Sequence, residues 1–152
     1  MTDVIHAALE SRVDVLALAA RVRDAAMREL TVRRAHELSL VVAELAGNAV
    51  RHAGGGEAWV QLSAVAWTVE VVDRGPGFTE AVLRDGGRSD RLGPDGVRPL
   101  DEPAPSFGSG LASARRLASR LVIENTPGGG ARAWAEWSDE RLTTAVWERK
   151  HR

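Results

Sequence analysis

The sequence has no cysteine, and Lys150 is its one lysine among 152 residues. Without cysteine the chain can form no disulfide framework and no thiolate zinc site, and it has no thiol nucleophile. One lysine in a total of 20 Lys and Arg residues leaves 19 arginines. Any cation that contacts a phosphate group in this protein would therefore be an arginine or a histidine.

The chain also lacks an excess of charge and any long hydrophobic run. Its 20 basic and 21 acidic side chains give a net charge of −1, which argues against a bulk electrostatic attraction to nucleic acid. The longest apolar stretch, 38–50, is too short to span a bilayer, and the N-terminus lacks the pattern of a signal peptide. We expect a soluble, cytoplasmic, single-domain protein that contacts neither nucleic acid nor a membrane.

The rest of the composition, 44% hydrophobic and 27% charged, is that of an ordinary globular domain. Apolar residues repeat with a helical period after the capping-box pattern Ser11-x-x-Asp14, to about Glu29, and again from Thr31 to about His52. Alternation predicts strands over 4–9, 58–63, 67–73, 121–124 and 131–137, and further helices are expected from 110 and over 138–152. This order predicts an α+β fold, a two-layer sandwich in which about three helices cover one face of a mixed, mostly antiparallel sheet.

Residues 79–107 differ in composition from the rest of the chain. They hold four of the six prolines, are rich in Gly, Asp and Arg, and follow neither the period of a strand nor that of a helix. A segment of this length without regular structure inside a compact domain is typically a functional loop. We expect a lid that is mobile in the absence of a ligand.

Two polar residues stand out in the second predicted helix. Glu44 and Asn48 are four residues apart, which places them on one face one turn apart. Arg51 and His52 continue this stripe along a helix that is otherwise largely apolar. A carboxylate in apolar surroundings is costly unless it has a partner or a task. The stripe is also compatible with a solvated helix face that includes Glu37.

Two glycine-rich motifs follow this helix in the sequence. Asp73 ends a Val-rich strand and precedes Gly75 and Gly77, which allow positive φ angles and a close approach of the backbone to a ligand. Residues 108–111, Gly-Ser-Gly-Leu, stand immediately before a predicted helix, where exposed N–H groups bind phosphate. Taken separately, the first motif also fits a common turn and the second a flexible loop.

The order of these motifs is more specific than any one of them. They resemble the N, G1 and G2 boxes of the GHKL family of ATP-binding domains, which share the Bergerat fold of histidine-kinase-like ATPases. The three boxes are carried by Glu44 and Asn48, by Asp73, Gly75 and Gly77, and by Gly108 and Gly110. The resemblance covers about residues 4–137 and implies ATP and Mg²⁺ as cofactors.

The resemblance also implies roles for single residues. Glu44 would be the general base, Asn48 would ligate Mg²⁺, and Asp73 would accept the amino group of adenine. The other residues expected to contact the nucleotide, at its base or its phosphates, are Gly75, Gly77, Arg51, His52, Gly108, Ser109, Gly110 and Leu111.

The length of the chain favours one branch of the family. We expect no room for the dimerisation helix of histidine kinases, and residues 44–57 and 85–87 resemble the stressosome switch kinases. This branch implies a serine/threonine protein kinase of a bacterial partner-switching pathway that phosphorylates a STAS-domain antagonist or scaffold protein. The open alternatives are an anti-sigma factor that binds a sigma factor directly and a docking module that binds little nucleotide. A phosphatase and a second copy of the chain are further partners that the sequence leaves open.

Two features depart from the family pattern. Ala131 stands where many relatives have a threonine that supports adenine through water, and losing that hydroxyl would weaken binding by about 1 kcal/mol. The lid at about 79–107 is longer than in the small kinases, and ordering it on ATP would cost entropy. We expect a kinase domain over 1–137 and a helical extension over 138–152 that contacts a partner, a second copy or the chain's own sheet.

Overall fold

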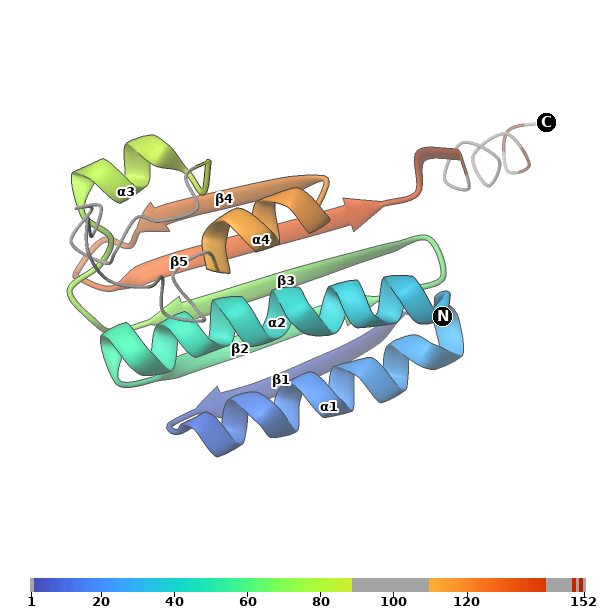
Figure 1. Ribbon diagram of the computed structural model, residues 1–152, viewed down its shortest axis with the longest axis horizontal. Helices are drawn as coiled ribbons and strands as arrows, with labels where there is room; N and C mark the ends of the chain where they lie inside the picture. The colour runs from blue at the N-terminus through green and yellow to red at the C-terminus, as the bar shows by residue number, and fades with distance from the viewer. Residues whose placement is uncertain (1, 89–109, 142–148, 150, 152) are drawn as a thin grey trace, which may run out of the picture.

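The computed structural model describes residues 2–88 and 110–141, together with residues 149 and 151 (Figure 1). The helices in these residues are α1 (Arg12–Glu29), α2 (Val32–Ala53), α3 (Glu80–Asp85) and α4 (Gly110–Leu117). The strands are β1 (Asp3–Leu9), β2 (Gly56–Leu62), β3 (Ala66–Asp73), β4 (Arg120–Asn125) and β5 (Ala131–Ser138).

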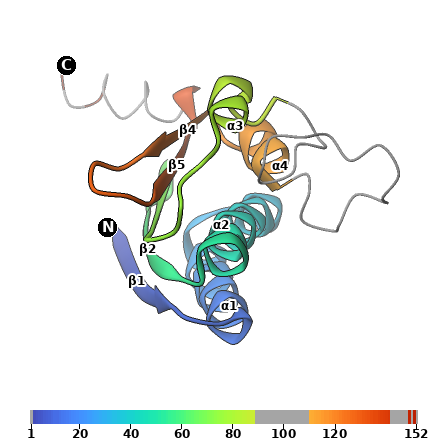
Figure 2. The same cartoon turned by 90° about the vertical axis from the view of Figure 1, so that its left-hand side faces the viewer.

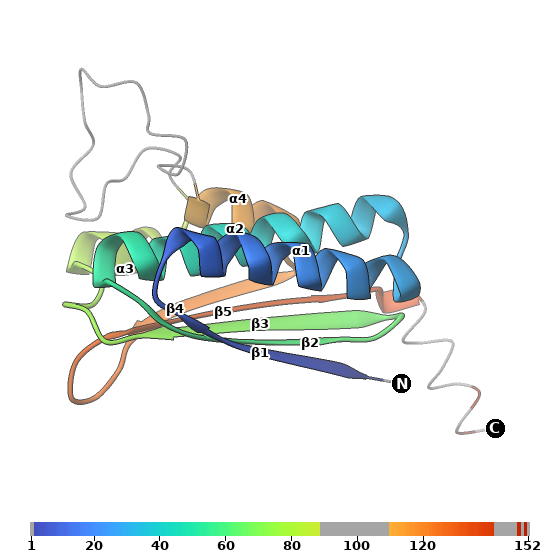
Figure 3. The same ribbon diagram turned by 90° about the horizontal axis from the view of Figure 1, so that it is seen from below.

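The strands form one sheet in the order β1-β2-β3-β5-β4, and every neighbouring pair is antiparallel. Two hairpins, β2–β3 and β4–β5, meet at the centre of the sheet, where β5 pairs with β3. Helices α1, α2 and α4 lie on one face of the sheet (Figures 2 and 3). The predicted two-layer α+β sandwich is confirmed, although the described strands include no parallel pair of the expected mixed sheet.

Local sequence sets the boundaries of the two long helices. The side chain of Asp14 accepts a hydrogen bond from the N–H of Ser11 at 3.1 Å, as the predicted capping box requires. At the start of α2 the hydroxyl of Thr31 accepts one from the N–H of Arg34 at 3.2 Å. α2 ends at Gly54, which has a φ of 74°. These caps satisfy polar groups that a helix end leaves unpaired.

α2 is the central helix of the layer. The sheet lies beneath it, and α1 and α4 pack against it from either side. Leu38, Val41, Val42 and Leu45 are therefore at most 2% exposed, and each such side chain contributes about 1.5–3 kcal/mol on burial. The outer side of the helix is not covered in the described residues, and Leu40 there is 52% exposed. This packing fixes the polar residues of α2 relative to the sheet.

The first part of the predicted lid is helical, so the expectation of a segment without regular structure over 79–107 is wrong there. The hydroxyl of Thr79 caps α3 by accepting from the N–H of Val82 at 3.3 Å, and Val82 is 5% exposed. Arg115 of α4 donates to the carbonyl of Gly86 at 2.8 Å. A cap and tertiary contacts thus stabilise a helix too short to show a period. Residues 89–109 lie outside the described residues.

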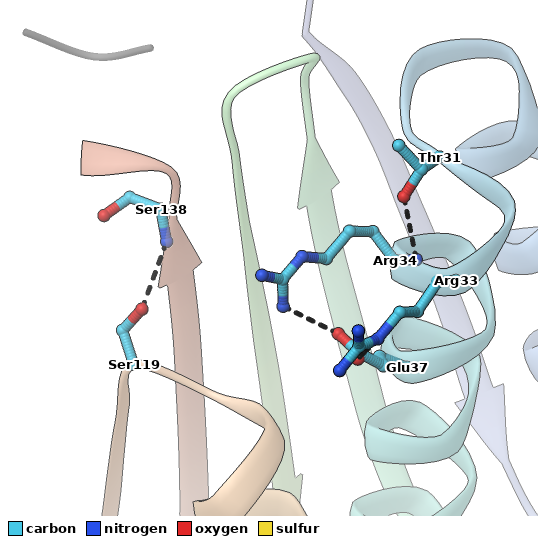
Figure 4. Close-up of polar contacts among 6 residues, drawn as sticks. All are labelled: Thr31, Arg33, Arg34, Glu37, Ser119 and Ser138. Atoms are coloured by element: carbon cyan, nitrogen blue, oxygen red, sulfur yellow. Dashed lines mark hydrogen bonds and ion pairs between the residues drawn. The ribbon is translucent and has the colours of Figure 1, made fainter. Parts of the chain in front are cut away.

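One other boundary differs from the prediction. Ser138, expected in the C-terminal helix, ends β5 and donates its N–H to the hydroxyl of Ser119 at 3.3 Å (Figure 4). Most of the predicted helix over 138–152 lies outside the described residues. In the described part of the chain, every helix is too short or too polar to span a membrane.

Candidate functional site

The polar stripe of α2 has two chemically different ends. Near the start of the helix, the carboxylate of Glu37 accepts hydrogen bonds from Arg33 at 3.0 Å and from Arg34 at 2.8 Å (Figure 4). The guanidinium of Arg34 also lies 4.8 Å from the ring centroid of Trp137. This end of the stripe is a network of ion pairs in which Arg33 and Arg34 balance the charge of Glu37.

Glu44, two turns further along, is held differently. Its side chain is half-buried, and its Oε2 atom is buried without a hydrogen-bond partner among the described residues. Desolvation by burial raises the pKa of Glu44 above its ordinary value of 4.5, and the positive charge of Arg51 offsets this in part. A buried acceptor without a partner is costly, so Glu44 is better explained by a task than by solvation.

The first turn of α4 closes over this carboxylate. A Cβ atom placed on Gly110 would lie 2.5 Å from Oε2 of Glu44 and 3.6 Å from Nδ2 of Asn48. A larger residue at position 110 would therefore displace the carboxylate of Glu44, whereas glycine lets the N-terminus of α4 lie directly over it. Leu111, the next residue, is half-buried and packs against the core. The structure thus brings Glu44, Asn48 and Gly110 together, while Gly108 and Ser109 lie outside the described residues.

Asp73 lies at the end of β3 and is fixed by one of its two oxygens. Oδ1 accepts hydrogen bonds from the N–H of Gly75 at 3.0 Å and from the N–H of Ala131 at 3.1 Å. Oδ2 has no hydrogen bond to the described part of the chain and is left as an acceptor. Because residue 131 supports Asp73 through its backbone, this contact does not depend on the hydroxyl of the expected threonine.

Asn125, which the sequence analysis did not single out, fixes the glycine turn after Asp73. Its Oδ1 accepts from the N–H of Phe78 at 2.7 Å and its Nδ2 donates to the carbonyl of Phe78 at 2.9 Å. Gly77 has a φ of 85°, and a Cβ there would lie 2.7 Å from Oδ1 of Asn125. The two partners are 47 residues apart, so no local sequence pattern reveals the contact.

Replacing Asn125 by alanine is expected to loosen this turn. Each lost hydrogen bond at a solvent-exposed site contributes about 0.5–1.5 kcal/mol, so nucleotide affinity should fall by about 3–10-fold if the turn holds the base. Asn125→Asp keeps the acceptor but loses the donor, and it should show a comparable defect. Titration calorimetry with ATP measures both. An unchanged affinity in both variants would show that the turn does not contact the nucleotide.

Arg51 and His52 lie near the C-terminal end of α2. Desolvation, followed by the positive charge of Arg51, lowers the pKa of His52, while Asp73 raises it by a smaller amount. His52 is therefore largely neutral at neutral pH. Arg51 lies close enough to Asn48 to donate to its Oδ1 at 3.4 Å. Of the two residues, Arg51 is the better candidate for a cation near phosphate.

The residues of the candidate site lie in two groups at different positions along α2. Gly75 lies directly against Ala53, the last residue of the helix, and Glu44 lies nine residues, or about 13–14 Å, before Ala53. Asp73 and the glycine turn thus stand at one end of the site, and Glu44, Asn48 and the start of α4 at the other. No group of three or more His, Asp or Glu side chains that could hold a metal occurs in the described part of the chain.

Comparison with known proteins gives the same family as the motifs. The sequence model of a family described as "Histidine kinase-, DNA gyrase B-, and HSP90-like ATPase" matches residues 34–141, more than half of the chain. Sensor protein CseC of Streptomyces avermitilis is 33% identical over 116 residues, which cover 68% of this chain and 22% of that protein. The chain therefore spans about a fifth of the length of this relative.

Solved structures show the same fold at low sequence identity. A chain of the SiaB–SiaC complex from Pseudomonas aeruginosa has a TM-score of 0.56 at 16% identity, covering 90% of this chain and 89% of that one. The mycobacterial sensor histidine kinase MprB has a TM-score of 0.52 at 16% identity, covering 90% and 97%. Full-length ShkA in complex with AMPPNP has a TM-score of 0.51 at 19% identity, covering 82% and 30%. The chain belongs to the family of histidine kinase-, DNA gyrase B- and HSP90-like ATPases, as its ordered motifs predict.

Proposed function

We propose that this domain binds Mg·ATP along α2 and transfers the γ-phosphoryl group to the hydroxyl of a serine or threonine in a partner protein. The observation that carries the proposal is Glu44, a half-buried carboxylate with an unpaired buried oxygen beside the N-terminus of α4. A domain that only bound nucleotide would have no use for a base at this place. Family membership supports nucleotide binding, and the geometry of Glu44 supports phosphoryl transfer.

The nucleotide would lie with its base at Asp73 and its phosphates at α4. Oδ2 of Asp73 is available to accept the amino group of adenine, and the turn through Gly75 and Gly77 lets the backbone pass close to the base. The span of about 13–14 Å along α2 is comparable to the length of an extended nucleoside triphosphate. The N–H groups at the start of α4, from Gly110 and Leu111 and from Gly108 and Ser109 before them, would contact the phosphates.

The oxygen ligands available at the phosphate end of the site fit magnesium. Mg²⁺ prefers oxygen ligands and is usually held by one or two protein groups together with substrate phosphates and water. Oδ1 of Asn48 would be such a ligand, and the lack of a larger carboxylate cluster in the described residues is compatible with this mode. When bound, the ion would neutralise charge on the phosphate oxygens.

Glu44 would act on the acceptor. As the hydroxyl oxygen of the partner bonds to the γ-phosphorus and the bond to the β–γ bridging oxygen breaks, Glu44 takes the hydroxyl proton and ADP leaves. Because burial raises the pKa of Glu44, its carboxylate is a stronger base than an exposed one. Arg51 would supply positive charge next to the phosphates.

The partner proposed is a STAS-domain protein, on the resemblance of the boxes to the small partner-switching kinases. The structural likeness to a chain of a two-protein complex suits a domain that acts on a separate protein. In this proposal residues 79–107 cover the nucleotide and residues 138–152 contribute to partner contacts. Direct binding of a sigma factor and docking without transfer are the alternatives within the same fold.

A second candidate acceptor is a histidine. The relatives include a sensor protein that is much longer than this chain and a histidine kinase of the same fold. A histidine on another polypeptide, or on a part of a longer chain, would use the same nucleotide site. The two acceptors differ in the chemistry of the phosphorylated product.

Labelled phosphate transfer separates these functions. The protein is incubated with [γ-³²P]ATP, Mg²⁺ and any STAS-domain proteins encoded beside it, and the product is treated with acid and with alkali. We expect label on the STAS protein that survives acid and is lost in alkali, as for phosphoserine. Acid-labile label would indicate a histidine acceptor. ATP binding without transfer to any of these proteins would support the docking module.

A further inference from the structure

The helices α3 and α4 are in contact, although a long stretch of the chain separates them (Figure 2). The guanidinium of Arg115, in the second half of α4, donates a hydrogen bond to the carbonyl of Gly86 at 2.8 Å, and the two residues are 29 positions apart in the sequence. Gly86 is the C-cap of α3 and has a φ of 60°. Arg115 therefore joins the C-terminal end of α3 to α4.

Gly87 makes a second contact at the same junction. A Cβ atom placed on Gly87 would lie 2.9 Å from the carbonyl oxygen of Leu111 and 3.2 Å from Cδ2 of Leu121. Its φ of 84° is also one that residues with a side chain rarely adopt. Leu111 and Arg115 are four residues apart, which places them on one face of α4. Two consecutive glycines at the end of α3 thus contact the same face of α4.

The position of Arg115 is also favourable for α3. The last carbonyl groups of a helix carry partial negative charge and have no partner within the helix. Arg88 donates to two more of them, the carbonyls of Arg84 and Asp85, both at 3.3 Å. A helix of six residues is not stable by itself in water. α3 therefore depends on these caps and on its contact with α4.

The packing of α4 on the core holds its first turn weakly. The buried residues of α4 are Gly110, Ala112 and Ala114, and residues of this size bury little apolar surface. Leu111, the first large side chain of α4, is half-buried. Packing on α2 therefore contributes little free energy to fix the first turn, and the contact with α3 adds a restraint at Leu111.

The first turn of α4 is the part of the protein that would contact the phosphates in the proposed function. Gly110 lies over the carboxylate of Glu44 and close to Asn48, and N–H groups at a helix N-terminus bind phosphate. We propose that Arg115 is a positioning residue for the phosphate end of the nucleotide site: it holds α3 against Leu111 and so keeps the first turn of α4 over Glu44. This role of Arg115 rests on the proposed function and requires no contact between Arg115 and the nucleotide.

A displaced first turn of α4 should weaken the binding of phosphates but not that of the base. In the proposed function adenine lies at Asp73, about 13–14 Å along α2 from Glu44. Adenosine, which has no phosphate, should therefore bind equally well with and without the contact between α3 and α4, whereas ATP should not. The ratio of ATP to adenosine affinity separates positioning from a general loss of stability, because a less stable fold would bind both ligands less well.

Arg115→Ala should lower this ratio by about 10-fold or more in the presence of Mg²⁺, as expected for the loss of one hydrogen bond from a charged donor. Titrations of the full chain, followed by amide NMR shifts, measure both dissociation constants, and thermal melts check the fold. Arg28→Ala removes a guanidinium from the exposed side of α1 and should leave the ratio unchanged. A wild-type ratio in Arg115→Ala, or an equal loss of affinity for both ligands, would overturn the proposal.

Gly87→Ala tests the same junction with Arg115 in place. Its Cβ would press on the carbonyl of Leu111, so the ratio should fall here too, and an unchanged ratio would contradict the proposal. The double variant Gly87→Ala/Arg115→Ala should lose little more than either single variant, because both changes act through one contact. Independent effects that multiply would show that Arg115 acts on the phosphates directly, against the proposal. A wild type that binds neither ATP nor adenosine would overturn the proposed function itself, and the role of Arg115 with it.

Discussion

Replacement of Glu44 by glutamine is expected to reduce phosphoryl transfer by about 10²–10⁴-fold, the usual cost of losing a positioned base, with little change in ATP affinity. The glutamine amide keeps the size of the side chain beside Gly110, so α4 keeps its place over α2. It has no lone pair basic enough to take a proton from a hydroxyl. Single-turnover transfer with saturating ATP, together with calorimetry of ATP binding, separates these two quantities.

Glu37→Gln is the matched control, since it makes the same change on the same helix. Glu37 is already paired with Arg33 and Arg34 (Figure 4), far from the start of α4. Glu37→Gln should therefore transfer the phosphoryl group at the wild-type rate. Equal transfer by Glu44→Gln and the wild type would show that another group accepts the proton.

Glu44→Gln should also change the stability of the protein, in a pH-dependent way. Burial raises the pKa of Glu44 in the folded protein above its ordinary value of 4.5. The folded state thus binds the proton of Glu44 more tightly than the unfolded chain does. The stability that Glu44 contributes is therefore fully present below pH 4.5 and is lost as the pH rises through the raised pKa. Glutamine does not ionise, so the Glu44→Gln variant does not lose stability in this way. Thermal melts should show a higher Tm for Glu44→Gln at pH 8 and a smaller difference at pH 4, with a shift of about 2–4 °C for each kcal/mol.

The stripe of α2 shows what sequence could and could not predict about the site. Helical spacing places Glu37, Glu44 and Asn48 on related faces, but it does not distinguish a paired carboxylate from an unpaired one. That difference arises from what packs above each residue: two arginines over Glu37, and the glycine of α4 over Glu44. The order of the three boxes was therefore needed to select Glu44, and the structure supplies the physical reason.

The other sequence predictions also succeed where the signal is local and fail where a contact joins residues far apart in the sequence. The strands and long helices follow from periodicity and from caps at Ser11 and Thr31, because these are local signals. The contact of Asn125 with Phe78 and the short helix α3 were missed, because both depend on residues far away in the sequence. The backbone support that Ala131 gives to Asp73 was missed for the same reason.

Replacement of Asp73 by asparagine is expected to weaken ATP binding by about 30-fold or more, equivalent to about 2 kcal/mol for a hydrogen bond to a charged group, while the fold stays intact. Asparagine can keep its oxygen at the position of Oδ1, where Gly75 and Ala131 donate. The amide nitrogen then replaces Oδ2, so a donor faces the amino group of adenine. Calorimetry measures the affinity, and thermal melts check that Tm is retained.

Two further variants show whether the loss comes from the base contact. Asp73→Ala removes both backbone contacts as well, so it should lower Tm in addition to affinity, whereas Asp24→Asn, an exposed change on α1, should alter neither. Guanine presents a carbonyl acceptor where adenine presents its amino group, and the amide of Asp73→Asn can donate to it. The ratio of GTP to ATP affinity should therefore rise in Asp73→Asn relative to the wild type. An unchanged ratio together with wild-type ATP affinity would mean that adenine does not bind at Asp73.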